Sequence, residues 1–372
     1  MIKMKGLLSI GFSDIIGTGI SAIFWFFLAG LIEPEEFGEI FYFIGIAGIA
    51  FSISLIGTQD TIMVYTAKNV KIQSTFYLLS LIAGGISSIV IIMIFFRVDA
   101  GLLLLGYIIT PLVIGDLLGR KLYGSYSKYF LMQKGLTLIL GLGFYYLFDV
   151  YGVLYGIALS YSVYAIRIYK GFKEFKIDFS LLKPRFGFII NNYMVFLANS
   201  SKNQIDKLII APLLGFAFLG NYALALQIVG LMLIFNNIVF KYTLPQDATG
   251  NPNKKLKKLI LLLSIGIAIV GFLFSPIIIQ ELFPKYNEAI VAIQIMSVSV
   301  IPATVSMIYT SKFLGLEKSK FVLISKIISL ITIISGTVIL GSIFGMIGLA
   351  IAFVLSISVE AMAFVLLNLK SK

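Results

Sequence analysis

The chain has 372 residues, of which 59% are hydrophobic and only 12% are charged. About a quarter of the residues of a soluble domain are charged, so this composition excludes an ordinary soluble protein. The net charge of +12 would suit a nucleic-acid partner, but the basic residues gather in short loops at alternate apolar runs. That distribution is typical of the cytoplasmic loops of a membrane protein. We therefore expect an all-α polytopic membrane protein with no nucleic-acid partner.

Several kinds of chemistry are excluded by what the sequence lacks. It contains no cysteine and no histidine, so it has no disulfide, no thiolate metal site and no imidazole general base. It also lacks the glycine-rich loop with which ATP-driven pumps bind phosphates. We expect no enzymatic activity, no cofactor and no bound metal ion.

Apolar runs of about 20 residues, the length that a helix needs to cross a bilayer, recur from end to end. They predict about twelve spans, at residues 7–31, 40–62, 76–96, 101–119, 131–149, 152–169, 188–212, 215–240, 257–280, 288–310, 320–340 and 343–368. The first apolar run is too long for a signal-peptide core, so we expect it to be retained as a span. Six spans fall in a predicted N-terminal lobe with a cytoplasmic linker, residues 1–185, and six in a C-terminal lobe, residues 186–372.

The stretch NSSKNQIDK, residues 199–207, interrupts the seventh apolar run with polar side chains. Basic clusters lie on either side of it, at 167–185 and at 241–258. If both clusters are cytoplasmic, an even number of spans must separate them. Residues 186–240 leave room for two spans and not for four. The polar stretch is therefore predicted to lie inside a span.

The charge distribution predicts that both termini lie on the cytoplasmic side of the cytoplasmic (inner) membrane. Of the 29 Lys and Arg residues, only Arg97 and Lys285 fall in the predicted outer loops. Four others fall within spans, namely Lys134, Lys202, Lys207 and Lys326. The outer loops carry acidic residues instead, as in EPEEFGE at 33–39.

The two halves of the chain resemble each other weakly. Residues 28–48 align with residues 210–230, and four positions match: Ala29/Ala211, Leu31/Leu213, Gly38/Gly220 and Gly48/Gly230. Because each half has six spans, both halves start on the same side and would form parallel repeats, a known transporter plan. The alternative is that two apolar sequences align by chance.

Helical spacing at about 100° per residue places the polar side chains of the seventh span on one face. The members of this polar stripe are Asn192, Asn199, Lys202, Asn203, Asp206 and Lys207. Three charges facing lipid would cost roughly 8–10 kcal/mol, so the stripe must face protein or water. Lys202 and Asp206 are four residues apart and could pair, whereas Lys207 has no obvious local partner. The stripe either lines a cavity or is buried packing; its three charges and three amides favour the cavity.

The first span carries a shorter stripe of Asp14, Thr18, Ser21 and Trp25, spaced 4, 3 and 4 residues apart. It too lines a cavity or packs against another helix.

Other ionisable residues in the spans favour structural roles. Lys326 and Glu360 lie at similar depth on antiparallel neighbours and are expected to form an ion pair, as are Asp116 and Arg120 at one helix end. Lys134 either extends toward the membrane surface or attracts an anionic substrate. The GxxxG matches at Gly115–Gly119, Gly152–Gly156 and Gly341–Gly345 are expected to serve helix packing.

Several segments resemble a known family. LAGLIEPEEFGEIFYF, after the first span, is similar to the segment that links the first two helices in polysaccharide repeat-unit flippases of the Wzx type. QIDKLIIAPLLGFAFLGNYALA resembles the seventh helix and following turn of that family. The family belongs to a superfamily that also contains multidrug (MATE-type) exporters and lipid-linked peptidoglycan precursor flippases. The chain departs from the last group, because it has twelve predicted spans and not fourteen and no arginine in its first two spans.

The resemblance implies two six-helix lobes around a cleft that opens alternately to each side of the membrane. It implies transport of a polyprenyl-pyrophosphate-linked oligosaccharide to the outer leaflet for surface polysaccharide assembly. The residues expected to bind this substrate are Asn199, Lys202, Asn203, Lys207, Trp25 and Lys134. Asp14 and Asp206 would serve ion coupling, with H⁺ or Na⁺, or would hold the lysines. Expected partners are the lipid-linked glycan, membrane lipids, a glycan polymerase and glycosyltransferases.

Two other functions compete with this prediction. One is an ion-coupled antiporter of the same fold for drugs or small molecules; the lysine-bearing stripe favours an anionic or sugar substrate over a lipophilic cation. The other is a membrane scaffold for glycan assembly that transports nothing. A scaffold would need the stripe for folding but not for activity.

Overall fold

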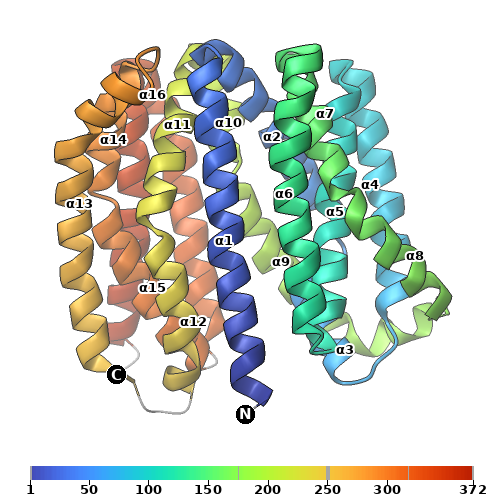
Figure 1. Ribbon diagram of the computed structural model, residues 1–372. Coiled ribbons are helices and arrows are strands. Elements are labelled where there is room, and N and C mark those ends of the chain that lie inside the picture. Colours follow the sequence, from blue (N-terminus) through green and yellow to red (C-terminus); the bar gives the residue numbers. More distant parts are fainter. Residues whose placement is uncertain (1, 175, 249–251, 317, 371–372) are drawn as a thin grey trace. The chain divides into compact units, whose positions relative to one another are not determined.

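A computed structural model describes residues 2–174, 176–248, 252–316 and 318–370 (Figure 1). These residues are 90% helical and contain no strand, so the predicted all-α polytopic architecture is confirmed. Lys372, which was predicted to lie on the cytoplasmic side, is outside the described residues.

The chain forms two compact units, and each is described separately. Unit 1 comprises residues 1–28 and 43–204, and unit 2 comprises residues 29–42 and 205–372. The lobes predicted at 1–185 and 186–372 stay a prediction.

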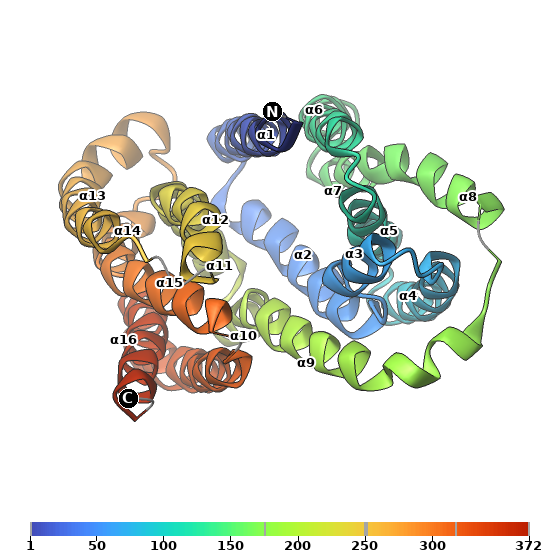
Figure 2. The same cartoon turned by 90° about the horizontal axis from the view of Figure 1, so that it is seen from below.

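Unit 1 contains most of α1 (Ile2–Leu31), the later part of α2 (Pro34–Ser54), and seven further α-helices. These are α3 (Gln59–Ala67), α4 (Gln73–Phe95), α5 (Val98–Gly119), α6 (Tyr123–Phe148), α7 (Val150–Ser160), α8 (Ala165–Glu174) and α9 (Phe186–Lys202). Short 3₁₀ segments lie at η1 (Tyr161–Tyr164), η2 (Phe179–Leu181) and η3 (Lys183–Arg185). Figure 2 shows α9 beside α2 and α3.

Unit 2 contains the junction of α1 and α2 and the remaining helices. These are α10 (Ile205–Leu214), α11 (Phe216–Met232), α12 (Ile234–Ala248), α13 (Lys254–Leu282), α14 (Glu288–Ser297), α15 (Val300–Gly315) and α16 (Ser319–Lys370).

Within the described residues, seven helices are long and apolar enough to cross a membrane, or up to nine if the bent pairs α11–α12 and α14–α15 each form one span. Helix α16 has 52 residues and covers both of the last two predicted spans. It bends at Gly345, whose φ of +56° is a left-handed conformation that favours glycine. Gly345 therefore permits the bend, and Gly341 packs closely as predicted, since a Cβ atom there would lie 2.8 Å from the Leu349 side chain beyond the bend.

The continuous helix predicted across 188–212 is wrong. Helix α9 ends at Lys202 and α10 begins at Ile205. The backbone N–H groups of Asn203 and Gln204 donate to Ser200 and Ser201, three residues back, which tightens the end of α9 into a turn. Serine and asparagine compete with helix formation through their own side chains, so a run of them favours a helix end. The polar stripe is therefore divided between two helices.

The other two GxxxG matches pack helices closely, as predicted. A Cβ atom on Gly115 would lie 2.7 Å from the carbonyl oxygen of Gln59 in α3. A Cβ atom on Gly156 would lie 2.3 Å from the carbonyl oxygen of Leu140 in α6. Glycine is thus required where α5 meets α3 and where α7 meets α6.

The aligned glycines of the two repeats pack directly against each other in unit 2. A Cβ atom on Gly38 would lie 1.9 Å from the carbonyl oxygen of Phe216, and one on Gly220 would lie 1.8 Å from that of Pro34. Pro34 and Phe216 are themselves equivalent in the repeat alignment. The contact is therefore reciprocal, because each repeat presents the same glycine to the same position of the other.

A buried ion network fixes α8 to the end of α5 in unit 1. Asp116, with a fully buried side chain, forms ion pairs of 2.7 Å with Arg120 and with Arg167. Both arginines also contact Glu174, at 2.7 and 2.8 Å. The predicted Asp116–Arg120 pair is confirmed, and Arg167 and Glu174 extend it.

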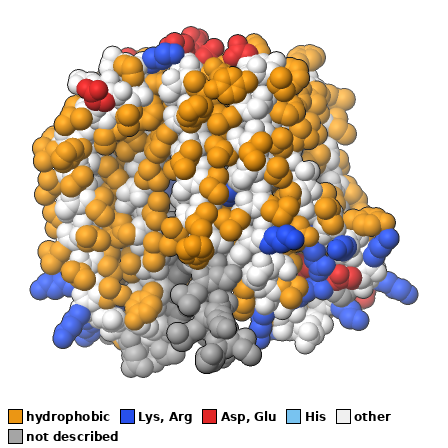
Figure 3. Space-filling view, viewed as in Figure 1, with side chains coloured by type: hydrophobic (Ala, Val, Ile, Leu, Met, Phe, Trp, Pro, Cys, Tyr) orange, Lys and Arg blue, Asp and Glu red, His pale blue; other side chains and the backbone are white. Residues whose placement is uncertain are grey.

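In unit 2, exposed lysines lie at the start of α13, and acidic residues lie beyond its other end. Its first turns carry Lys254, Lys255 and Lys258, all exposed. Beyond its other end, Lys285 pairs with Glu33 at 2.9 Å, beside the acidic α1–α2 junction. Figure 3 shows acidic side chains at the end that carries this junction and Lys and Arg side chains near the start of α13. Which end faces the cytoplasm stays a prediction.

We expect Gly220→Ala to destabilise the protein by about 1–3 kcal/mol, because the added methyl group forces the crossing with α2 apart. Gly230→Ala, on the same helix and with open space around its Cβ position, is the matched control and should be neutral or slightly stabilising. Thermal unfolding of the two variants in detergent measures the difference. Equal melting temperatures would contradict the close contact.

The ion network also predicts a pH dependence of stability. Burial alone would raise the pKa of Glu174, but hydrogen bonds and charges from Arg167 and Arg120 outweigh it and lower that pKa. A carboxyl with a lowered pKa in the folded state stabilises the fold at neutral pH and loses this effect as pH falls through the folded pKa. The melting temperature of wild type should therefore exceed that of Glu174→Gln at pH 7, and the two should converge below the usual glutamate pKa. A difference that stays constant down to acid pH would exclude this role.

Candidate functional site

Asp14, the acidic member of the stripe predicted in the first span, lies on a seam between α1 and α6 in unit 1. Tyr126 donates a hydrogen bond of 2.6 Å from its hydroxyl to Asp14 Oδ1. The Thr18 hydroxyl donates to the Asp14 backbone carbonyl at 2.7 Å. Three contacts join the two helices along the seam, namely Asp14 with Tyr126, Gly17 with Phe130, and Phe24 with Gly141. The residue numbers of α1 and α6 increase together along these contacts, so the two helices run parallel. The first and fifth predicted spans cross the membrane in the same direction, so this orientation agrees with the prediction.

Lys134 lies on the α6 side of this seam. Its Nζ atom is 5.5 Å from the centre of the Phe130 ring, and that ring stacks on Tyr126 at 5.7 Å. Asp14 and Lys134, which were singled out separately in the sequence, are thus linked through two stacked rings. Trp25 is half-buried further along α1, with its ring 4.8 Å from Phe24.

The stripe residues of α9 also belong to unit 1. Asn199 and Lys202 are partly buried near the end of α9, and Asn203 is exposed just after it. The amide nitrogen of Asn192 donates to the Phe188 carbonyl of the preceding turn at 3.0 Å. The predicted substrate contacts of these residues stay predictions.

The remaining stripe residues, Asp206 and Lys207, lie on α10 in unit 2. Both are buried, and the Lys207 Nζ atom lies 3.6 Å from Asp206 Oδ1. The Tyr222 hydroxyl of α11 donates to Asp206 Oδ2 at 3.2 Å. The expectation that Lys207 lacks a local partner is therefore wrong, because α10 starts anew at Ile205 and turns its first residues toward α11. Breaking such a buried pair costs about 3–5 kcal/mol, so this pair has a structural role in addition to any other.

The other predicted pair is confirmed in the same unit. Lys326 and Glu360 of α16 lie 2.6 Å apart, on either side of the bend at Gly345.

A pocket of about 410 Å³ opens in unit 1 where five elements meet. It is lined by Phe51 of α2, Gln59 and Asp60 of α3, Tyr107, Thr110 and Pro111 of α5, Tyr161 of η1, and Phe196 of α9. Its volume lies in the range of pockets that enclose small-molecule ligands.

Aromatic rings form much of the wall of this aromatic pocket. Phe51 contacts Tyr107 and Phe196 edge-on, with ring centres 5.9 and 5.4 Å apart. Tyr161 meets Tyr107 in the same manner at 5.6 Å. The hydroxyl of Tyr193 donates to the Ile53 carbonyl at 2.8 Å and fixes α9 beside α2. Edge-on contacts hold the rings in place and leave ring faces available to a ligand.

Asp60 is the carboxylate of the aromatic pocket. It lies in the first turn of α3, where Thr58 caps the helix by accepting a hydrogen bond from the Thr61 N–H. A negative side chain is favoured at that end of a helix by the helix dipole. The Asp60 side chain is exposed, and among the described residues no ion pair or hydrogen bond engages its carboxylate. It contrasts with Asp116 and Asp206, which are buried and paired.

Sequence reasoning missed Asp60 although a signal was present. Asp60 falls inside the predicted span 40–62, and an ionisable residue in a span is by itself a reason to suspect function. The aromatic residues gave no comparable signal, since aromatic side chains abound in this chain and these come from four separate elements.

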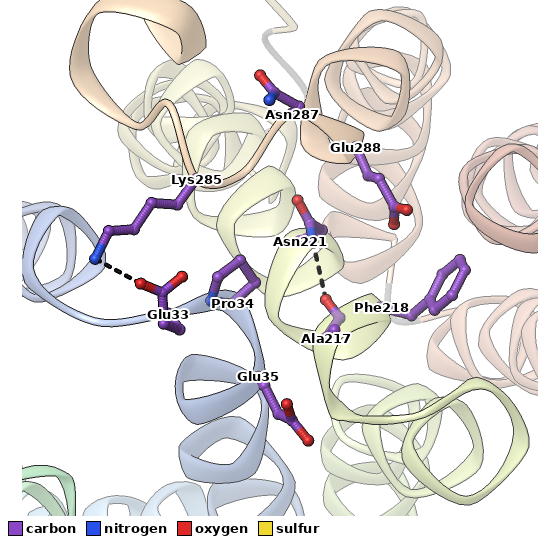
Figure 4. Close-up of a pocket in the computed structure, with 9 residues that line it drawn as sticks. All are labelled: Glu33, Pro34, Glu35, Ala217, Phe218, Asn221, Lys285, Asn287 and Glu288. Carbon is purple, nitrogen blue, oxygen red and sulfur yellow. Dashed lines mark hydrogen bonds and ion pairs between the residues drawn. The ribbon is translucent and has the colours of Figure 1, made fainter.

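A second pocket, of about 400 Å³, lies in unit 2 and is shown in Figure 4. It is lined by Glu33, Pro34, Glu35, Ala217, Phe218, Asn221, Lys285, Asn287 and Glu288. In Figure 4, Lys285 reaches toward Glu33, while Phe218 and Glu288 lie on the other side of Asn221. The buried Asn221 amide is satisfied on both sides, because it donates to the Ala217 carbonyl and accepts from the Ala289 N–H.

A hydrogen bond from the turn between α13 and α14 holds one side of the second pocket in place. The Tyr286 hydroxyl donates to the Ile32 carbonyl at 3.3 Å. Burial first, and then the nearby charges of Glu33 and Glu36, raise the pKa of Tyr286 well above its usual value, so it remains a donor at all physiological pH. Within the described residues, no group of three or more acidic side chains is arranged to bind a metal ion. We therefore interpret the second pocket as an acidic junction of helices that hydrogen bonds hold in place. Of the two pockets, we consider the aromatic pocket the better candidate for binding a ligand.

Comparison with known proteins gives matches at the level of structure only. No protein-family model matches the chain, and no curated protein sequence matches it. An inward-facing multidrug resistance MATE transporter of the MOP superfamily superimposes with a TM-score of 0.76 at 17% identity, covering 98% of each chain. The lipid II flippase MurJ in an inward closed conformation superimposes with a TM-score of 0.77 at 14% identity, covering 99% of this chain and 87% of that one. A MATE protein in a bent conformation gives 0.66 at 17% identity, over 99% and 95% of the two chains.

These similarities extend over nearly the whole chain, and the matched proteins are transporters and a flippase and not enzymes. At such low identity they show a shared fold and leave the substrate open. The chain is a multi-pass membrane protein with the fold found in MATE transporters and in the MurJ flippase.

Proposed function

We propose that this protein moves a polyprenyl-pyrophosphate-linked oligosaccharide across the cytoplasmic membrane by alternating access, for surface polysaccharide assembly. Two arguments support the proposal: the fold shared with a lipid-linked precursor flippase, and the segments that resemble Wzx-type flippases. The chain would perform no covalent step, and its termini would lie in the cytoplasm. Glycosyltransferases and a glycan polymerase would supply and consume the substrate.

The aromatic pocket is the observation that carries the proposal. Sugars present hydroxyl donors around their rim and apolar C–H faces above and below the ring. Asp60 and Gln59 offer acceptors for those hydroxyls, while Phe51, Tyr107 and Phe196 offer apolar ring surfaces. Hydrogen bonds to a carboxylate contribute about 1.5–3 kcal/mol each, so they would add to ring stacking in holding a neutral sugar.

The predicted site residues of unit 1 complete this proposal. Lys134 and Lys202 are partly buried cations that would attract the pyrophosphate, with Trp25, Asn199 and Asn203 contributing to the sugar path. Asp14 would couple transport to an ion through its hydrogen bond with Tyr126. Each of these roles is part of the proposal.

A second candidate function follows from the same pocket. A carboxylate beside aromatic rings is also the arrangement that binds lipophilic cations, through charge attraction and cation–π contact. An ion-coupled multidrug antiporter is therefore the competing function, and transport of a dye cation distinguishes it from glycan flipping.

We predict that Asp60→Asn lowers glycan translocation by about tenfold or more, since loss of one charge-assisted hydrogen bond removes roughly 1.5–3 kcal/mol. Glu281→Gln, at an exposed carboxylate of α13 outside both pockets, is the matched control and should transport like wild type. The measurement is the protection of a fluorescent lipid-linked oligosaccharide from an added glycosidase in proteoliposomes.

The same vesicles distinguish the alternatives. Glycan flipping that is equal in Asp60→Asn and Glu281→Gln would exclude the aromatic pocket as the binding site. Ion-driven ethidium uptake without glycan flipping would establish the antiporter. A protein that inserts and folds but moves neither compound would support the scaffold.

A further inference from the structure

The segment of residues 165–174 and 176–188 in unit 1 combines exposed apolar and basic side chains. It comprises α8, η2, η3 and the first turn of α9, and we refer to it as the linker segment. In Figure 1, α8 is the green helix at the edge of unit 1. The transport proposal above makes no use of this segment.

The inner face of the linker segment is fixed to the start of α4. The Ser74 hydroxyl donates to the Gly171 carbonyl at 3.0 Å, and Gly171 packs so closely on Tyr77 that a Cβ atom would lie 2.5 Å from the ring. Further along, Thr75 and the Asp178 backbone exchange two hydrogen bonds, of 2.9 and 3.2 Å. The segment is therefore held against the start of α4 and the end of α5, two helices that are long and apolar enough to cross a membrane.

Both acidic side chains described in the segment interact with other groups of the protein. Glu174 pairs with Arg120 and Arg167, the arginines that also bind Asp116. Asp178 accepts two hydrogen bonds from Ser180, at 2.6 and 2.9 Å. Glu174 is thus neutralised by arginines of the protein itself, and the Asp178 carboxylate is hydrogen-bonded within its own turn.

The outer face, by contrast, carries cations that the protein leaves unneutralised. Lys170, Lys173, Lys176 and Lys183 are all exposed. Across the described part of the chain, none of the four forms an ion pair with a carboxylate; Lys173 lies 4.4 Å above the Tyr169 ring.

Large apolar side chains are interleaved with these lysines. They are Ile166, Tyr169, Ile177, Phe179, Phe186 and Phe188, with exposed fractions of 58, 60, 44, 52, 64 and 41%. Figure 3 shows the mixture of basic and hydrophobic side chains over this part of unit 1. Water alone does not favour such a surface, and nucleic acid or an acidic protein would match only its charge.

We propose that the linker segment lies in the headgroup layer and binds anionic phospholipids of the leaflet it faces. The apolar side chains enter the boundary of the acyl chains, and the lysines meet the phosphate groups. A lipid surface is the one partner that supplies an apolar phase and negative charges in adjacent layers.

Site-specific quenching by labelled lipids tests this proposal. The chain has no cysteine, so a single Gly187→Cys substitution, where a Cβ meets open space, accepts a bimane fluorophore. Gly143→Cys near the other end of unit 1 also has open space and is the matched control. Full-length protein is reconstituted with equal fractions of phosphatidylglycerol or phosphatidylcholine that carries a doxyl quencher near the headgroup.

We expect quenching at position 187 to be at least twofold stronger with the anionic lipid, and equal for the two lipids at position 143. Changing the four lysines together, with Lys170→Gln, Lys173→Gln, Lys176→Gln and Lys183→Gln, should abolish the preference at 187 and leave position 143 unchanged.

Three results would overturn the proposal. Equal quenching by both lipids at 187 in the otherwise unchanged protein would show that the segment does not select anionic lipid. No quenching by either would place the segment in water, with an acidic protein as its partner instead. A preference that survives the fourfold lysine change would show that these lysines are not the binding groups.

Discussion

A charge placed among apolar helices needs a partner, and the pairing of such charges organises both units of this protein. Asp116 is buried with Arg120 and Arg167 in unit 1, and Asp206 is buried with Lys207 in unit 2. Lys326 and Glu360 are paired in the same way across the bend in α16. An unpaired charge in such surroundings costs several kcal/mol, so each of these groups restrains the helices that carry it. Against this pattern, the exposed Asp60 carboxylate stands out as a group available to a ligand.

Close backbone contact is the second restraint, and it follows the internal repeat. Gly38 and Gly220 occupy equivalent positions, and each lies against the backbone of the other repeat. No side chain larger than hydrogen fits at either position, so the sequence similarity between the halves has a physical reason here. The aligned pair Gly48 and Gly230 does not have this physical reason, since Gly230 has open space around its Cβ position and makes no close backbone contact.

Much of the helical architecture could be predicted from the sequence, because span length and charge distribution report directly on the membrane. The pairs Asp116–Arg120 and Lys326–Glu360 were predictable too, since each joins opposite charges at similar depth. The break in the helix after Lys202 could not be predicted in this way. Placing the polar residues on one face of a helix already assumes that the helix is continuous through them.

The aromatic pocket could be predicted only in part. Asp60 was visible as a charge within a span, but its ring neighbours are set by how α2, α5, η1 and α9 pack. Those distant contacts leave no periodic signal in a single sequence. The polar stripe, which the sequence made conspicuous, proved to contain a buried pair on α10 and partly buried side chains on α9.

The central claim is that the transported glycan is held in the aromatic pocket, and photo-crosslinking tests it most directly. Phe196 lines that pocket and Phe218 lines the second pocket, in unit 2, and each is replaced by p-benzoylphenylalanine in a separate variant. The two variants are then irradiated with radiolabelled lipid-linked oligosaccharide. The account predicts covalent capture of the glycan at position 196 and not at position 218. Capture at 218 alone, or at neither position while the protein still flips the glycan, would contradict it.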